Sequence, residues 1–326
     1  MKLLPKGEAD PWMRLHWFTM ETPASGHDPV LLDETLHWLD PRPGQVVVDC
    51  TLGRGGHASA IASRLGPAGL LIGLDVDPHN LAFAQERLRG VDCPVRLFHA
   101  NFAELGDVLA EVGREKVSAI LADLGISTNQ LFDSRYGLSF AQSMPLDMRI
   151  DPRLRQTAAD MVNSLKEPQL ANVLYELAQE RYSRRIARNI VEARRLSPIT
   201  TTERLADLVR QAYAARGGSH ERIDPATRTF LALRMAVNQE ISNLRALLEE
   251  SPGFLETGGR LAIISFQSTE DRMVKQAFRS AEQTGRVKIL TNKPICPNES
   301  EAIANPRSRS AKLRVIENVM EKTSRS

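Results

Sequence analysis

An apolar strand that ends in an acid and a glycine-rich turn is the segment of this sequence best suited to chemistry. Val46–Val48 is an apolar, β-branched run typical of a central parallel strand, and Asp49 follows it directly. The turn at residues 53–57 has the sequence GRGGH, and apolar residues then recur at helical spacing. Glycines between a strand and a helix let the backbone approach a ligand closely, and the helix start offers unpaired N–H groups. We therefore expect a cofactor to bind at this turn.

A second acid follows at the spacing expected for a nucleotide-like cofactor. The apolar run Leu70–Leu74 ends at Asp75, 22 residues after Gly53, where its carboxylate is placed to hold a ribose. A G-x-G-x-x-A turn followed by such an acid fits a dinucleotide as well as S-adenosylmethionine, so an NAD-dependent dehydrogenase is one alternative. Two features favour S-adenosylmethionine. The carboxylate of Asp49 suits an ammonium and a sulfonium better than a pyrophosphate, and no second mononucleotide-binding half is visible.

The alternation of strands and helices predicts an α/β fold with a mostly parallel, Rossmann-like sheet. Val95–Phe98 and Val117–Ala122 each follow a helix-like segment and read as two further strands. Ligands of such sheets bind at the carboxyl ends of the strands. The predicted ends carry Asp49, Asp75, Asn101, Phe102 and Asp123. We expect these polar ends to define one site.

The interval before the next strand predicts an inserted all-helical subdomain. The apolar run at residues 260–266 comes long after the fourth strand, and helix signals fill the gap. A T-x-x-E capping box at residues 200–203 opens one helix, and Asp-Pro at residues 224–225 opens a second whose apolar stripe runs through Leu248. A third helix starts near Leu170 and continues into an arginine-rich segment.

These elements, with a last strand at residues 310–316, predict the domain organisation. The segments are an N-terminal extension at 1–26, a catalytic domain at 27–133 and 251–318, a helical substrate-recognition insertion at 134–250, and a tail at 319–326.

Composition is that of an ordinary globular protein. The 326 residues are 42% hydrophobic and 25% charged. No apolar run is long enough to span a membrane, and residues 1–27 lack the apolar core of a signal peptide, so we expect a cytoplasmic protein. The three cysteines lie far apart without metal-ligand spacing, so we expect neither disulfides nor a metal.

The net charge is only +2, but the positive charges are concentrated in two basic clusters. Residues 181–195 carry six arginines against Glu192, and residues 286–314 carry seven lysines or arginines against Glu299 and Glu301. Each cluster has a net charge of +5, which leaves the remainder at −8. Clustered positive charge on an otherwise acidic protein indicates binding to a phosphate backbone, although a solvated helix face is an equal interpretation for the first cluster.

Six motifs stand in order along the chain. They are HDPVLLDE at 27–34, GRGGH at 53–57, DLGIS at 123–127, PLDMR at 145–149, PATRTF at 225–230 and NPRSRS at 305–310. Together they resemble the bacterial N4-cytosine methyltransferases of small-subunit ribosomal RNA known as RsmH or MraW, over about residues 27–318. The resemblance implies a class I methyltransferase fold with a helical insertion and S-adenosylmethionine as methyl donor. It further implies a cytidine in the decoding region of 16S rRNA as target, within the small ribosomal subunit, and allows a homodimer.

The resemblance also assigns the cofactor contacts by position. These are Gly55, Gly56, His57, Asp75, Phe102, Asp123 and Gln130. We expect Asp123 to face the reacting centre, because the end of the fourth strand brings cofactor and substrate together, and we expect Ser127 close behind it. The alternative for Asp123 is a helix-capping aspartate.

Substrate contacts are expected at Asp147, Arg149, Arg228 and Arg307. Asp147 and Arg149 either orient the target base or pair with each other, and the other two arginines contact phosphates or are structural. One position departs from the family, because Gln267 stands where a histidine is usual. Glutamine keeps a hydrogen bond but cannot titrate, so a second hypothesis is an rRNA-binding assembly factor that has lost turnover.

Overall fold

The computed structural model describes residues 29–214 and 224–319. The predicted extension at 1–26, and the tail beyond residue 319, lie outside the described residues.

A seven-stranded sheet forms the centre of the catalytic domain, with the strand order β3-β2-β1-β4-β5-β7-β6. The strands are β1 (Val46–Asp49), β2 (Leu70–Asp75), β3 (Val95–His99), β4 (Val117–Asp123), β5 (Leu255–Ser265), β6 (Val287–Ile289) and β7 (Lys312–Asn318). Neighbours among β1–β5 pair in parallel, whereas β7 runs antiparallel to β5 and to β6. This arrangement confirms the predicted α/β architecture with a mostly parallel sheet.

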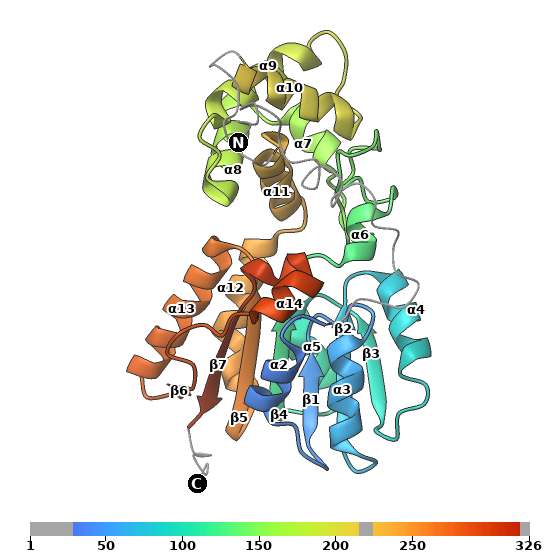
Figure 1. Cartoon of the computed structure of the whole chain (residues 1–326), viewed down its shortest axis with the longest axis vertical. Helices are drawn as coiled ribbons and strands as arrows, with labels where there is room; N and C mark the ends of the chain where they lie inside the picture. The colour runs from blue at the N-terminus through green and yellow to red at the C-terminus, as the bar shows by residue number, and fades with distance from the viewer. Residues whose placement is uncertain (1–28, 215–223, 320–326) are drawn as a thin grey trace, which may run out of the picture.

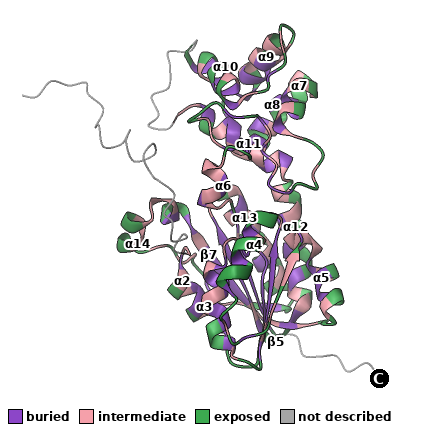
Figure 2. Ribbon diagram, turned by 90° about the vertical axis from the view of Figure 1, so that its right-hand side faces the viewer, coloured by how far each residue is buried: buried purple, intermediate pink, exposed green. Residues whose placement is uncertain are grey.

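Helices cover both faces of the sheet (Figure 1). One face packs against α2 (Leu32–Leu39), α3 (Gly56–Leu65) and α4 (Pro78–Arg87), and the other against α5 (Leu105–Val112), α12 (Glu240–Glu250) and α13 (Ser268–Gln283). Neighbouring strand residues serve opposite faces, so Val47 belongs to the first apolar cluster and Val48 to the second. The strands therefore form a buried centre between two helical layers, as Figure 2 shows.

A helical unit with its own core stands beyond the carboxyl ends of the strands (Figure 1). Its helices are α7 (Ala158–Ser164), α8 (Glu167–Ala178), α9 (Ser183–Arg194), α10 (Thr202–Ala214) and α11 (Ala226–Val237). Its apolar cluster includes fully buried residues of each helix, such as Leu174 of α8, Ile190 of α9 and Leu233 of α11. The short helix α6 (Thr128–Phe132) leads from β4 into this unit. These five helices therefore pack around an apolar cluster of their own.

The apolar stripe predicted as one helix after residue 224 is two helices, so that prediction was wrong in length. Asp224 does open α11, since its Oδ1 accepts a hydrogen bond from the Ala226 N–H at 2.8 Å. The helix ends at Val237, and α12 begins only after Gln239, whose φ is 53°. Asn238, at the break, binds a distant loop through its side chain, which periodicity along the chain does not encode.

Two further helix starts differ from the prediction. The helix that begins near Leu170 does not continue into the arginines, because α8 ends before Gln179 in the left-handed region (φ 53°) and α9 starts at Ser183. The cap of α10 is Thr201 and not Thr200, since the Thr201 Oγ1 accepts from the Arg204 N–H at 3.4 Å.

The core contacts of α12 bear on the domain boundary. Leu244, Leu247 and Leu248 pack in the apolar cluster of the sheet and not in that of the helical unit. We therefore propose that the insertion ends at Asn238, earlier than the predicted boundary at residue 250. Within the described residues, no helix is long and apolar enough to cross a membrane.

Candidate functional site

A cavity of about 450 Å³ lies at the carboxyl ends of β1–β4. Its walls come from the glycine-rich turn, from the segments that follow β2, β3 and β4, and from the starts of α12 and α13. Ile150, Asp151 and Leu154 of the insertion also line it, as does Arg307 of the 3-10 helix η3 (Pro306–Ser310). The volume is within the roughly 300–1,000 Å³ usual for small-molecule sites.

The glycine-rich turn owes its shape to backbone conformations that side chains disfavour. Gly53 and Gly55 have φ values of 51° and 76°. At Gly56, a Cβ atom would lie 3.2 Å from the ring of Pro29, so a larger residue would displace that neighbour. Asp75 ties the turn to β2, because its Oδ2 accepts from the Gly53 N–H at 2.7 Å. Contacts within the protein therefore fix the conformation of this turn, whose residues line the cavity.

Asp75 is a buried acid with capacity for a further partner. Its Oδ1 accepts from the Asp77 N–H at 2.8 Å. Burial raises the pKa of Asp75 to about 6. Its Oδ2 also accepts from the Asn80 Nδ2 at 3.4 Å. A carboxylate oxygen can accept two hydrogen bonds, so a ligand hydroxyl can still bind at Oδ1 where Asp75 lines the cavity.

Asp123, at the end of β4, presents an unsatisfied oxygen at the cavity. Its backbone N–H donates to the Thr51 Oγ1 at 2.6 Å, which fixes the end of the strand. Its Oδ1 is buried without a hydrogen-bond partner. Burial raises the pKa of Asp123 well above its ordinary value, and the negative charges of Asp49 and Glu270 act in the same direction. An unsatisfied buried oxygen is costly, so its place at the cavity fits a ligand that donates a hydrogen bond to Asp123.

His57 faces Asp123 as a neutral ring. Its Nε2 lies 3.0 Å from the Val30 carbonyl oxygen, and because a carbonyl only accepts, Nε2 carries the proton. Burial lowers the pKa of His57 to about 4, so the ring is uncharged near neutral pH. Its Nδ1 lies 3.8 Å from the Asp123 Oδ2. His57 therefore presents a lone pair, and not a positive charge, to this carboxyl group.

A hydrogen-bonded chain positions the start of α6 beside Asp123. The Ser127 N–H donates to the Gln130 Oε1 at 3.0 Å, and the Gln130 Nε2 donates to the Asp77 Oδ2 at 2.8 Å. The Tyr136 hydroxyl donates to the same Asp77 oxygen at 2.7 Å. Ser127 lines the cavity, and its Oγ is the second buried oxygen there without a partner.

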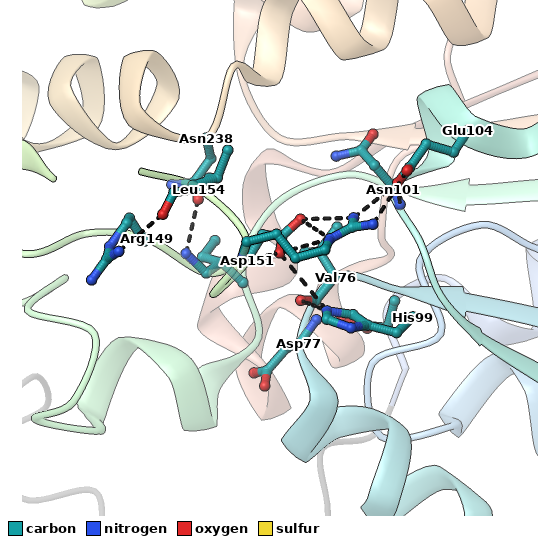
Figure 3. A network of polar contacts seen from close by, with 12 residues as sticks. Val76, Asp77, His99, Asn101, Glu104, Arg149, Asp151, Leu154 and Asn238 are labelled. Carbon is teal, nitrogen blue, oxygen red and sulfur yellow. Dashed lines mark hydrogen bonds and ion pairs between the residues drawn. The ribbon is translucent and has the colours of Figure 1, made fainter. Parts of the chain in front are cut away.

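A second network joins the insertion to the end of β3 (Figure 3). The Arg153 guanidinium donates to both Glu104 oxygens, at 2.8 and 3.2 Å, and to the Asp151 carboxylate at 2.8–3.0 Å. Asp151 also lies 3.8 Å from the His99 Nε2. Asn238 holds the other end of this loop, since its Oδ1 accepts from the Ile150 N–H at 2.9 Å. Glu104 and Asp151 both line the cavity, so the insertion contributes to its wall.

The structure brings most of the predicted site residues together. Those that line the cavity are Gly56, His57, Asp75, Phe102, Asp123, Ser127, Gln130 and Arg307. Gly55, Asp147, Arg149, Arg228 and Gln267 are not among its lining residues. Gly55 instead shapes the turn.

The motif at residues 145–149 forms an internal ion pair outside the cavity. The Arg149 Nε donates to the Asp147 Oδ1 at 2.7 Å, and the Arg149 Nη2 donates to the Asp147 Oδ2 at 2.8 Å. The Arg149 Nη1 donates to the Leu154 carbonyl at 2.9 Å. Of the two interpretations left open by the sequence, the geometry favours the pair, which braces the loop that carries Asp151.

Sequence reasoning did not single out several residues of the cavity wall. Glu104, Asp151 and Glu270 line it, together with Asn238 at the helix break. Glu270 accepts from the N–H groups of Phe266 and Gln267 at 3.1 and 3.0 Å, so it also satisfies the start of α13. The only sequence signal for it was its place in the first turn of a helix after a buried strand.

Comparison with known proteins identifies the family of this chain. The model of the MraW methylase family matches residues 24–319. The protein named ribosomal RNA small subunit methyltransferase H from Syntrophobacter fumaroxidans is 46% identical over 310 residues, which cover 90% of this chain and 97% of that protein. Proteins of the same name from Citrifermentans bemidjiense and Geobacter sulfurreducens are 44% and 45% identical, with coverage of 90% and 89% of this chain and 98% of each relative. On these matches, the chain belongs to the MraW methylase family.

Proposed function

We propose that this protein transfers a methyl group from S-adenosylmethionine to N4 of a cytidine in small-subunit ribosomal RNA, with Asp123 at the reacting centre. Membership of a methylase family confirms the predicted enzyme class and cofactor, and it removes the support for a dehydrogenase. The observation that carries the proposed site is the unpartnered Oδ1 of Asp123, buried at the cavity beside the glycine-rich turn. A cytoplasmic location follows from the proposed substrate.

The cavity suits S-adenosylmethionine in shape and donor set. We place the ribose at Asp75, which has spare acceptor capacity, and the adenine beside Phe102 at the end of β3. Gly56 and His57 would contact the methionine part, because the turn there brings backbone close to the cavity. Ser127 and Gln130 then border the space between cofactor and substrate. When bound, the cofactor supplies an electrophilic methyl group on a positively charged sulfur.

Asp123 performs two tasks in the proposed reaction. The N4 lone pair of cytosine is delocalised into the ring, so a carboxylate that accepts an N4 hydrogen helps to localise it. A positive charge nearby favours the ionised carboxylate, which opposes the effect of burial on the pKa of Asp123. As the bond from N4 to the methyl carbon forms and the bond from that carbon to sulfur breaks, a proton leaves N4, and Asp123 is placed to take it. Alignment by the cavity wall supplies much of the rate, about 7–11 kcal/mol in favourable cases.

Helix α9 supports an RNA substrate. Its inner face is apolar, with Ile186 and Ile190 fully buried. Arg184, Arg188 and Arg195 are exposed at spacings of four and seven residues, which places them on one outer face. Arg188 is 3.8 Å from Glu167, a long contact between exposed side chains. A row of exposed arginines fits the phosphates of an RNA strand. The name of the relatives, ribosomal RNA small subunit methyltransferase H, supports ribosomal RNA of the small subunit as that substrate.

The alternative of an assembly factor without turnover depended on Gln267. The N–H of Gln267 donates to Glu270 at the start of α13, and Gln267 is not one of the residues that line the cavity. This position outside the cavity wall favours the enzyme over the assembly factor. A cytidine inside a stacked RNA helix cannot reach a carboxyl group that lines a cavity, so the target base must be splayed out into the cavity.

Transfer of labelled methyl groups to purified small subunits that lack base methylation tests the proposed function. The wild-type protein should incorporate label, and Asp123→Asn should lose at least about a hundredfold in rate while it still binds S-adenosylhomocysteine. Asp107→Asn, an exposed aspartate of α5, is the matched control and should behave as wild type. Tight binding of cofactor and subunits by the wild type without any incorporation would refute the enzyme and support the assembly factor.

A further inference from the structure

Two of the arginines that line the cavity, Arg54 and Arg87, have no acidic partner among the described residues. Several other guanidinium groups pair with carboxylates within the protein, as in Arg89 with Glu86 and Arg260 with Glu317. Arg54 and Arg87 both line the cavity. Within residues 29–214 and 224–319, no carboxylate lies within ion-pair distance of either one. Two neighbouring cations without counter-charges are a ready site for an anion.

The two side chains flank the glycine-rich turn. The Arg54 guanidinium carbon lies 4.6 Å from the ring centre of Phe83, which stacks it in place. Arg87, the last residue of α4, reaches back so that its Cδ lies 3.8 Å from the position of a Cβ on Gly55. Gly55 adjoins Arg54 in the chain, so both side chains flank one short stretch of backbone. Phe83 is itself 39% exposed, which is unusual for a phenylalanine.

We propose that Arg54 and Arg87 form a phosphate subsite that holds the RNA backbone next to the target nucleotide. The inference rests on the proposed function and adds a contact that positions the strand at the mouth of the cavity. Arg87 is exposed and Arg54 half-buried, so the subsite opens outward, where a strand must pass when one base enters the cavity. The exposed ring of Phe83 offers a flat face beside it for an unstacked base. The carboxylate of the cofactor has the same oxyanion chemistry and is the competing occupant.

The double variant Arg54→Gln/Arg87→Gln tests the subsite, with Arg89→Gln as the matched control. Arg89 lies two residues from Arg87 and is also exposed, but it pairs with Glu86 and does not line the cavity. Binding of each full-length protein to small subunits lacking base methylation is measured from 50 to 200 mM salt. Calorimetry gives the affinity for S-adenosylhomocysteine separately.

We expect the double variant to bind subunits about tenfold more weakly than the wild type. The slope of log affinity against log salt concentration should become less steep by about 0.7–0.9 for each phosphate that the variant no longer binds. Its affinity for S-adenosylhomocysteine should stay within about twofold of wild type, as should both affinities of Arg89→Gln. Equal subunit binding by the double variant and Arg89→Gln would overturn the proposal. A loss confined to S-adenosylhomocysteine would assign the two arginines to the cofactor carboxylate and also overturn it. Failure of the wild type to methylate subunits that it binds would refute the proposed function, and the salt data would still decide the subsite.

Discussion

Replacing Asp49 by asparagine should make the protein more stable at high pH. Asp49 ends β1 behind the cavity, is 1% exposed, and accepts a hydrogen bond at Oδ1 from the Thr51 N–H at 3.1 Å. Burial raises its pKa from 3.8 to about 7, because the folded protein disfavours the ionised form. Asparagine keeps an acceptor oxygen for Thr51 and cannot ionise.

The size and sign of the effect follow from the two pKa values. The folded-state pKa of Asp49 exceeds its unfolded value, so the folded protein holds the proton more tightly. Its contribution to stability is present below about pH 4 and is lost as the pH rises through 7. A difference of about 3 pKa units corresponds to about 4 kcal/mol of unfolding free energy. Relative to wild type, Asp49→Asn should therefore gain about 4 kcal/mol between pH 4 and pH 8.

Urea denaturation of wild type and Asp49→Asn at pH 4, 6 and 8 measures this gain. Asp107→Asn serves as the control for loss of a carboxylate on the surface of α5. If Asp49→Asn differed from wild type by the same amount at every pH, the buried charge would not be the cause. A gain as large in Asp107→Asn would likewise refute the reasoning.

Three further predictions concern activity and binding. Asp49→Asn should shift the acid limb of the kcat/KM profile to lower pH, because the Asp49 charge contributes to the raised pKa of Asp123. An acid limb at the same pH as in the wild type would show that ionisation of Asp123 does not cause it. Arg153→Met should raise the Kd for S-adenosylhomocysteine severalfold, since two carboxylates of the cavity wall lose their partner, and calorimetry showing an unchanged Kd would contradict this. Arg184→Gln/Arg188→Gln should weaken subunit binding, reduce the slope of log affinity against log salt concentration by about one to two, and leave kcat unchanged. A fall in kcat alone would argue against a phosphate contact.

The sheet was predictable because its signals are local. Val46–Val48 and the runs before Asp75 and Asp123 are short and mostly apolar, and each ends at an aspartate on the rim of the sheet. The parallel order then brings Asp75 and Asp123 to one cavity. The family motifs added His57 and Gln130, whose roles no spacing rule shows.

The errors arose where distant contacts override a local pattern. Apolar spacing continues across the break after Val237, but the side chain of Asn238 binds Met148 and Ile150, and the chain turns there. For Asp147 and Arg149 the sequence left two interpretations open, and the structure has them paired with each other. Such pairings depend on loop conformation, which the order of residues does not reveal.

The position of the transferred methyl group tests the central claim most directly. After reaction of the wild-type protein with small subunits that lack base methylation, the rRNA is digested to nucleosides and analysed by mass spectrometry. The account predicts N4-methylcytidine with the wild type and its loss with Asp123→Asn. Methylation at another atom, or N4-methylcytidine formed at the wild-type rate by Asp123→Asn, would contradict it.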